Sequence, residues 1–257
     1  FLTVASKSLL NRKGSVAMTL MAISVAIFVL LGIEHVRQQA RDSFASTVSG
    51  VDLIVGAKTG SLNLLLYSVF RIGSPTDNIK WETFEQVVAD PAVSWAIPIS
   101  LGDSHEGYRV VGTTSAYFDH FSYGKKRRIE FINGVPFEGI FDAVLGSEVA
   151  KTLGYAVNSK IVLAHGLATT SFSLHDNKPF TVVGILAPTG TPVDQTIHVP
   201  LQGIDAMHSD WPQGPSNLTV KSRADPGANP AKPESITAFM LGLKSKSNCS
   251  SVFCERK

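Results

Sequence analysis

The residue types that most often carry out chemistry are scattered along this sequence. No pair of histidines shows the H-x-H or H-E-x-x-H spacing that brings two imidazoles to one zinc ion. His175 and Asp176 are adjacent, so their side chains diverge on either a helix or a strand. The histidines therefore predict no metal centre. The seven are His35, His105, His120, His165, His175, His198 and His208.

Motifs for nucleophilic catalysis and phosphate binding are also missing from the sequence. There is no G-x-S-x-G elbow, and the carboxylates do not repeat at a spacing suited to an acid and base pair. The segment GAKTGS (56–61) follows an apolar run, but its lysine lies between the glycines, where it does not match a P-loop. We therefore expect no enzyme, no catalytic, cofactor-binding or metal-binding residues, and no cofactor.

The cysteines and the net charge argue against a cysteine-ligated zinc site and against a nucleic-acid-binding protein. Cys249 and Cys254 both lie in the last nine residues, and their spacing matches no common zinc pattern. The net charge of +2 is too small to indicate a nucleic-acid partner. The basic run KKRR (125–128) is interpreted as a solvated loop.

One early stretch dominates the organisation of the chain. Residues 16–33 read VAMTLMAISVAIFVLLGI and hold no charge. At ~1.5 Å per residue this stretch nearly spans the ~30 Å hydrocarbon core of a bilayer, which predicts a transmembrane helix. A signal peptide has a shorter apolar region and a small-residue cleavage site, and a core helix would need a polar face. We therefore favour a retained membrane anchor.

The flanks of this stretch indicate its direction. Lys7, Arg12 and Lys13 precede it, which favours a cytoplasmic amino end, although Arg37 and Arg41 follow it. Residues 1–15 are then a cytoplasmic segment, and the bulk of the chain is extracytoplasmic. Residues 34–47 carry charge on most faces and are expected to form a helical stalk.

The remaining sequence predicts a mixed α and β domain, so the fold class is α+β with one amino-terminal transmembrane helix. Helices are expected over 61–72, 81–91 and 202–208, and a strand runs directly into a helix over 142–155. The turn 102–107 joins two strand-like runs, and His105 within it is interpreted as solvated. Strands are predicted at 51–55, 93–101, 108–114, 159–165, 168–174, 178–187, 196–201 and 217–223.

The order of these segments resembles the MacB/FtsX-type (LolC/LolE-like) permeases of ABC transporters. Six blocks carry the resemblance over about residues 5–222, each in the same order as in the family. They are SKSLLNRKG before the apolar stretch, GVDLIVGAK, WETFEQVVADPAVSWAIPIS, YRVVGTTSAYF, AVLGSEVAKTLGY and PFTVVGILAPTGTPVDQTIHVPL.

The resemblance implies a MacB-like periplasmic core domain over 48–222. Its porter-like part would comprise 48–120 with a return near 190–222, and a mainly β inserted part would comprise 121–189. Residues 223–257 would be a linker and a tail. Because the family has four spans and this chain has only the first, we expect a truncated or frame-altered fragment. SITAFMLGL (235–243) is too short for a second span.

The resemblance also implies a function and its partners. Members couple a cytoplasmic ATPase to the outer domain by mechanotransmission, in the bacterial inner membrane. The implied partners are the ABC ATPase subunit, a second permease copy in a dimer, a periplasmic adaptor or substrate protein, and membrane lipid. The alternative is a membrane-anchored extracytoplasmic ligand-binding or sensor domain.

Overall fold

The computed structural model describes residues 12–165, 178–208 and 233–245. The chain divides into two compact units, residues 1–46 and residues 47–257. We describe each unit by itself. The expected strands at 168–174 and 217–223, together with His175, Cys249 and Cys254, lie outside the described residues.

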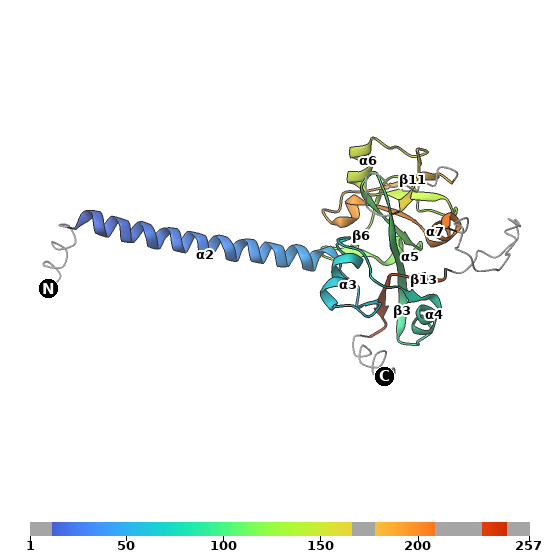
Figure 1. Ribbon diagram of the computed structural model, residues 1–257, viewed down its shortest axis with the longest axis horizontal. Coiled ribbons are helices and arrows are strands. Elements are labelled where there is room, and N and C mark those ends of the chain that lie inside the picture. The colour runs from blue at the N-terminus through green and yellow to red at the C-terminus, as the bar shows by residue number, and fades with distance from the viewer. Residues whose placement is uncertain (1–11, 166–177, 209–232, 246–257) are drawn as a thin grey trace, which may run out of the picture. The chain divides into compact units, whose positions relative to one another are not determined.

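The first unit is built on one long helix. Helix α2 (Lys13–Thr47) runs unbroken for 35 residues and covers both the predicted span and the predicted stalk (Figure 1). Its segment Lys13–Gln39 is long and apolar enough to cross a membrane, with a mean hydropathy of 2.6 and none of that apolar window buried. Such exposure fits an apolar environment around this helix, because moving apolar side chains out of water lowers the free energy.

The second unit contains a large mixed sheet that matches the predicted fold class. Its central order is β1-β14-β3-β4-β12-β8-β11-β7, with β10 beside β3 and β9 beside β11. The strands are β1 (Leu53–Gly56), β3 (Val93–His105), β4 (Tyr108–Thr113), β7 (Phe131–Gly134), β8 (Asp142–Leu145), β9 (Lys160–Ile161), β10 (Ala164–His165), β11 (Phe180–Leu186), β12 (Thr196–Pro200) and β14 (Ala238–Leu243).

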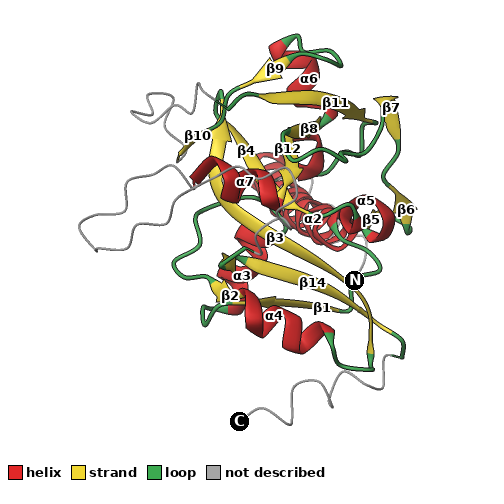
Figure 2. Cartoon of the chain, turned by 90° about the vertical axis from the view of Figure 1, so that its right-hand side faces the viewer, coloured by secondary structure: helices red, strands yellow, loops and turns green. Residues whose placement is uncertain are grey.

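Strand β3 belongs to both halves of this sheet (Figure 2). Its residues Val93 to Ile99 pair antiparallel with β14, and Ser100 to His105 pair antiparallel with β4. The register shifts between Leu101 and Ser104, a bulge that bends the strand. The lower half (β1, β14 and the start of β3) and the upper half are therefore joined through one continuous backbone.

In the lower half, successive apolar residues along a strand point to opposite faces of the sheet, so both faces are packed. Phe239 and Leu241 of β14 pack with Phe84 of α4 (Trp81–Val88), and the Phe84 and Phe239 rings lie 5.1 Å apart edge to face. Ala238 and Met240 face the other way and join the cluster of Tyr67 on α3 (Ser61–Ser68). This alternation follows from the two-residue period of a strand.

In the upper half, too, successive apolar residues point to opposite faces of the sheet. Val110, Ala143 and Ile197 belong to a cluster beneath α6 (Ser147–Leu153) and α7 (Leu201–His208). The next residues, Val111 and Val144, turn to the opposite face with α5 (Ala116–His120). Strand β4 pairs parallel with β12, and β8 pairs parallel with β11. Parallel strands of this kind are buried on both faces.

Two short ladders and a 3₁₀ turn complete the described fold. Strand β2 (Ile79–Lys80) pairs with β13 (Ser235–Ile236), and β5 (Ser122–Tyr123) pairs with β6 (Arg127–Arg128). The turn η1 (Pro192–Gln195) precedes β12. The expected strand-to-helix unit at 142–155 is present as β8 followed by α6, which ends at Gly154 in the left-handed conformation.

The carboxyl end differs from the sequence-based expectation. Strands β13 and β14 lie within 223–257, which we expected to be a linker and a tail. Strand β14 pairs with β1 on one side and β3 on the other. Within the apolar run 235–243, residues Ala238–Leu243 thus form an interior strand that completes the lower half of the sheet.

Candidate functional site

The histidines whose side chains the structure describes lie in separate parts of the chain. His120 is exposed and stacks on Trp95 with the ring planes 1° apart, and His35 lies exposed on α2. The described residues contain no group of three or more His, Cys, Asp or Glu side chains that could hold a metal ion.

His105 corrects the expectation of a solvated turn residue. It is the last residue of β3 and only 7% exposed. Its Nδ1 lies 2.7 Å from the carbonyl oxygen of Val162, and its Nε2 lies 2.9 Å from the Tyr155 hydroxyl. The strand extends four residues past the predicted end, so this side chain is drawn into the core.

A second histidine occupies an apolar position. His198 of β12 is fully buried and lies 4.8 Å from the Tyr117 ring, on the face opposite Ile197 and Val199. Neither of its ring nitrogens makes a hydrogen bond of good geometry, although the Val144 backbone lies near enough to favour the protonated form slightly. Burial lowers the pKa of His198 to about 3, with a smaller contribution from the positive charge of Arg71.

The segment that follows α2 is tied to two separate parts of the sheet-rich unit. Ser49 pairs with Ser122 of β5, with the Ser49 amide donating to the Ser122 carbonyl at 2.8 Å, and its hydroxyl accepts from the Lys126 amide at 3.2 Å. Three residues later, the Asp52 amide donates to Leu241 and the Asp52 carboxylate accepts from the Leu243 amide at 2.8 Å. We call residues 48–52 the joint. It is bonded to the β5–β6 hairpin and to β14.

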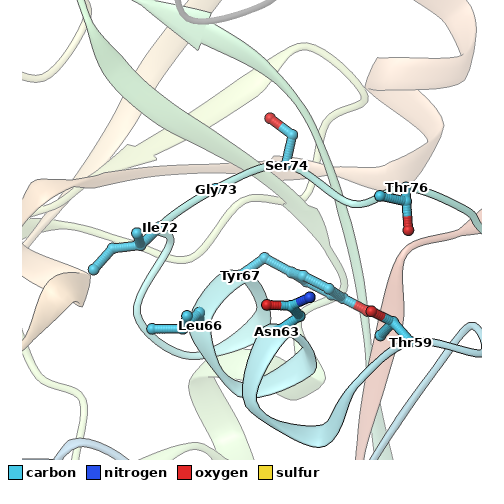
Figure 3. Close-up of a pocket in the computed structure, with 8 residues that line it drawn as sticks. All are labelled: Thr59, Asn63, Leu66, Tyr67, Ile72, Gly73, Ser74 and Thr76. Atoms are coloured by element: carbon cyan, nitrogen blue, oxygen red, sulfur yellow. The ribbon is translucent and has the colours of Figure 1, made fainter.

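A pocket of about 190 Å³ lies between α3 and the loop that follows it (Figure 3). Tyr67 and Asn63 approach it from α3, while Ser74 and Thr76 belong to the loop. Tyr67 is only 4% exposed, and burial raises the pKa of its hydroxyl. The full lining is Thr59, Asn63, Leu66, Tyr67, Ile72, Gly73, Ser74 and Thr76.

Arginine side chains donate to backbone carbonyls in the loop wall of this pocket and at the end of α3 beside it. Arg109 of β4 is 8% exposed, and its guanidinium donates to the Gly73 carbonyl. Arg71 donates to the Ser68 carbonyl at the end of α3 and has a φ of +60°. Gly73 also has a positive φ, of +82°. Burial lowers the pKa of both arginines, and for Arg71 the nearby Tyr117 acts in the opposite direction.

Comparison with known families identifies the chain. The family model described as the MacB-like periplasmic core domain matches residues 16–235. This chain belongs to the MacB-like periplasmic core domain family. The match to the MacB-like family starts inside α2 and ends at the first residue of β13, so it includes the joint and the pocket.

Two solved structures are similar to this MacB-like chain. One is the extracellular domain of the noncanonic ABC-type transporter YknZ from Gram-positive bacteria, at 11% identity and a TM-score of 0.41, covering 68% of this chain and 78% of that one. The other is the periplasmic region of MacB from Actinobacillus actinomycetemcomitans, at 11% identity and a TM-score of 0.47, covering 80% and 82%. A search of curated proteins gives no significant match.

The sequence did not indicate the joint or the pocket in this MacB-like domain. The joint pairs Ser49 with Ser122, residues 73 positions apart, through backbone groups that every residue type carries. The pocket depends on the backbone conformation of 71–73. One signal was available, because IGSPTDN (72–78) marked an irregular loop directly after an apolar helix.

Proposed function

We propose that this chain is the first membrane span and the periplasmic domain of an ABC transporter permease. The membership of the MacB-like family supports the class, and α2 supports anchoring in the bacterial inner membrane with the sheet-rich unit outside the cytoplasm. In this proposal the chain performs no catalytic step. A cytoplasmic ATPase supplies the energy, and the permease acts as a dimer.

The hydrogen bonds of the joint support a mechanical role for this domain. A displacement of α2 would reach Ser49 through one intervening residue, Val48. From there the bonds to Ser122 lead to the hairpin, and those of Asp52 lead to the lower half of the sheet. Coupling of this kind requires a continuous set of packed and bonded elements between the moving part and the responding part. The joint supplies such a set.

Lengthening the joint tests the proposal. The full-length permease would be purified with the ATPase subunit that copurifies with it, and spin labels would be placed on exposed residues Lys151 and Glu82. We expect ATP and vanadate to change the distance between the labels. Four glycines inserted after Thr47 should abolish that change, because a flexible segment absorbs displacement.

The matched control inserts four glycines after Asp77, in an exposed loop away from the joint. This variant should retain the response. An unchanged response in the joint variant, or the absence of any copurifying ATPase, would refute mechanical coupling. Extraction of the chain from vesicles by alkaline carbonate would separately refute the membrane anchor.

A further inference from the structure

The pocket beside α3 has a lining that selects a particular chemistry. We propose that it binds a small carboxylate that carries a short apolar chain. The site is independent of the mechanical proposal, because it rests on the pocket and on Arg109 behind its wall. Its volume of about 190 Å³ is the share of roughly six water molecules, which limits the ligand to a few heavy atoms.

The lining supplies hydrogen-bond donors without supplying charge. Thr59, Ser74 and Thr76 bring hydroxyl groups, Tyr67 a phenol and Asn63 an amide, and each of them can donate to a carboxylate oxygen. Leu66 and Ile72 supply the apolar part of the wall. No acidic side chain lines the pocket, so nothing in direct contact would repel an anion.

A buried cation lies behind the loop wall. Arg109 is 8% exposed, and its guanidinium donates to the carbonyl of Gly73, which lines the pocket. Among the described residues, no carboxylate forms an ion pair with Arg109. Buried charges are normally paired, because an uncompensated charge in the interior is costly. Arg109 therefore gives the pocket a positive potential that favours an anion.

The wall is held by the protein's own backbone conformation and hydrogen bonds. Arg71 and Gly73 hold left-handed backbone conformations, and the Arg109 hydrogen bond fixes the Gly73 carbonyl. A binding site formed in advance does not lose free energy in ordering its walls when the ligand arrives. The acidic residue next along the loop, Asp77, is exposed and accepts from the Asn78 amide at 2.8 Å, outside the lining.

A second hollow in the same unit provides a contrast. It has a volume of about 500 Å³ and is lined by residues that include Thr114, Ser115 and Glu138. Glu138 places a carboxylate in its wall, and no arginine or lysine lines it. The charge argument therefore singles out the pocket beside α3.

Three probes of similar size and different charge test the proposal on the full chain in detergent. Butyrate, butyramide and butylammonium would be titrated and followed by ligand-observed NMR. We expect butyrate to bind about tenfold more tightly than butyramide, because only the carboxylate is attracted by the charge of Arg109. Butylammonium should bind most weakly. Equal binding of butyrate and butyramide would overturn the proposal, as would a preference for butylammonium.

Variants locate the binding. Asn63→Trp, at an exposed position on α3, should fill the pocket and abolish butyrate binding, whereas Asn63→Ala removes one donor and should weaken binding by up to about tenfold. Arg109→Gln keeps a donor for Gly73 but removes the charge, so it should erase the preference for butyrate. Ser115→Ala, in the second hollow, is the matched control. Butyrate binding that survives in Asn63→Trp would place the site elsewhere and refute the proposal, even if Arg109→Gln fails to fold.

Discussion

The Nε2 atom of His105 accepts a hydrogen bond from the Tyr155 hydroxyl at 2.9 Å. The direction of this bond follows from the other side of the ring. The Val162 carbonyl can only accept, so Nδ1 of His105 carries the proton and Nε2 is left with a lone pair. The pair fastens the end of β3 to the segment that follows α6.

Replacing Tyr155 by phenylalanine should destabilise the domain. The change leaves Nε2 of a buried histidine without its donor, which costs roughly 1–3 kcal/mol in free energy of unfolding. Chemical denaturation of the full chain in detergent measures the loss. Tyr108→Phe is the control, since Tyr108 is a half-buried tyrosine that packs against the same core cluster. Equal losses in both variants would show that the hydroxyl of Tyr155 has no special role.

The buried His198 should make the domain sensitive to acid. Its folded pKa of about 3 lies below the value of 6.5 for a free imidazole. Between these values the unfolded chain binds the additional proton, so stability falls as the pH is lowered. From pH 7 to about pH 4.5 the loss from this residue should be on the order of 2–3 kcal/mol.

The measurement compares urea denaturation of the wild type and His198→Leu at the two pH values. The variant should lose less stability on acidification, because it has no imidazole to protonate on unfolding. His120→Gln, at an exposed position, should behave as the wild type does. A His198→Leu profile as steep as that of the wild type would contradict the assignment.

The joint should contribute to stability through Asp52. Its carboxylate accepts from the Leu243 amide, and Asp52→Ala leaves that amide without this acceptor. We expect a loss of roughly 1–3 kcal/mol and faster hydrogen exchange along Leu241 to Leu243. Asp77→Ala is the matched control, because its carboxylate caps only the neighbouring amide in an exposed loop. Unchanged exchange at Leu243 would refute the role of Asp52.

The carboxyl end of the domain can be tested by truncation. A chain that stops at residue 222 lacks β14, so β1 and the first half of β3 lose the strand between them. Limited proteolysis should then cut residues 53–105 readily, because unpaired strands expose their backbone. A chain that stops at residue 245 keeps β14 and should resist cleavage. Similar cleavage of the two chains would show that β14 is dispensable.

Local patterns in the sequence predicted much of the fold. The long apolar stretch gave the helix, WETFEQVV showed a helical stripe that became α4, and DAVLG leading into SEVAKTL became β8 and α6. These predictions succeeded because the periodicity of a segment is set by which face it buries. Each of these predictions depends only on residues that are close together in the sequence.

Relationships between distant residues were not predictable in the same way. The length of SITAFMLGL excludes a second membrane span, but it does not reveal that Ala238–Leu243 is a strand buried between two partners distant in the sequence. His105 was assigned to a turn because Gly102 and Asp103 resemble turn residues, yet both lie within β3. The pocket required the left-handed backbone at Arg71, which its residue type does not favour.

Helix α2 contains no proline and continues for 35 residues to Thr47, a length of about 52 Å at 1.5 Å per residue. Proline is the commonest cause of a sharp kink, so no such hinge interrupts this helix. In the proposed mechanical role, a displacement of the amino end would act directly on the chain at Ser49.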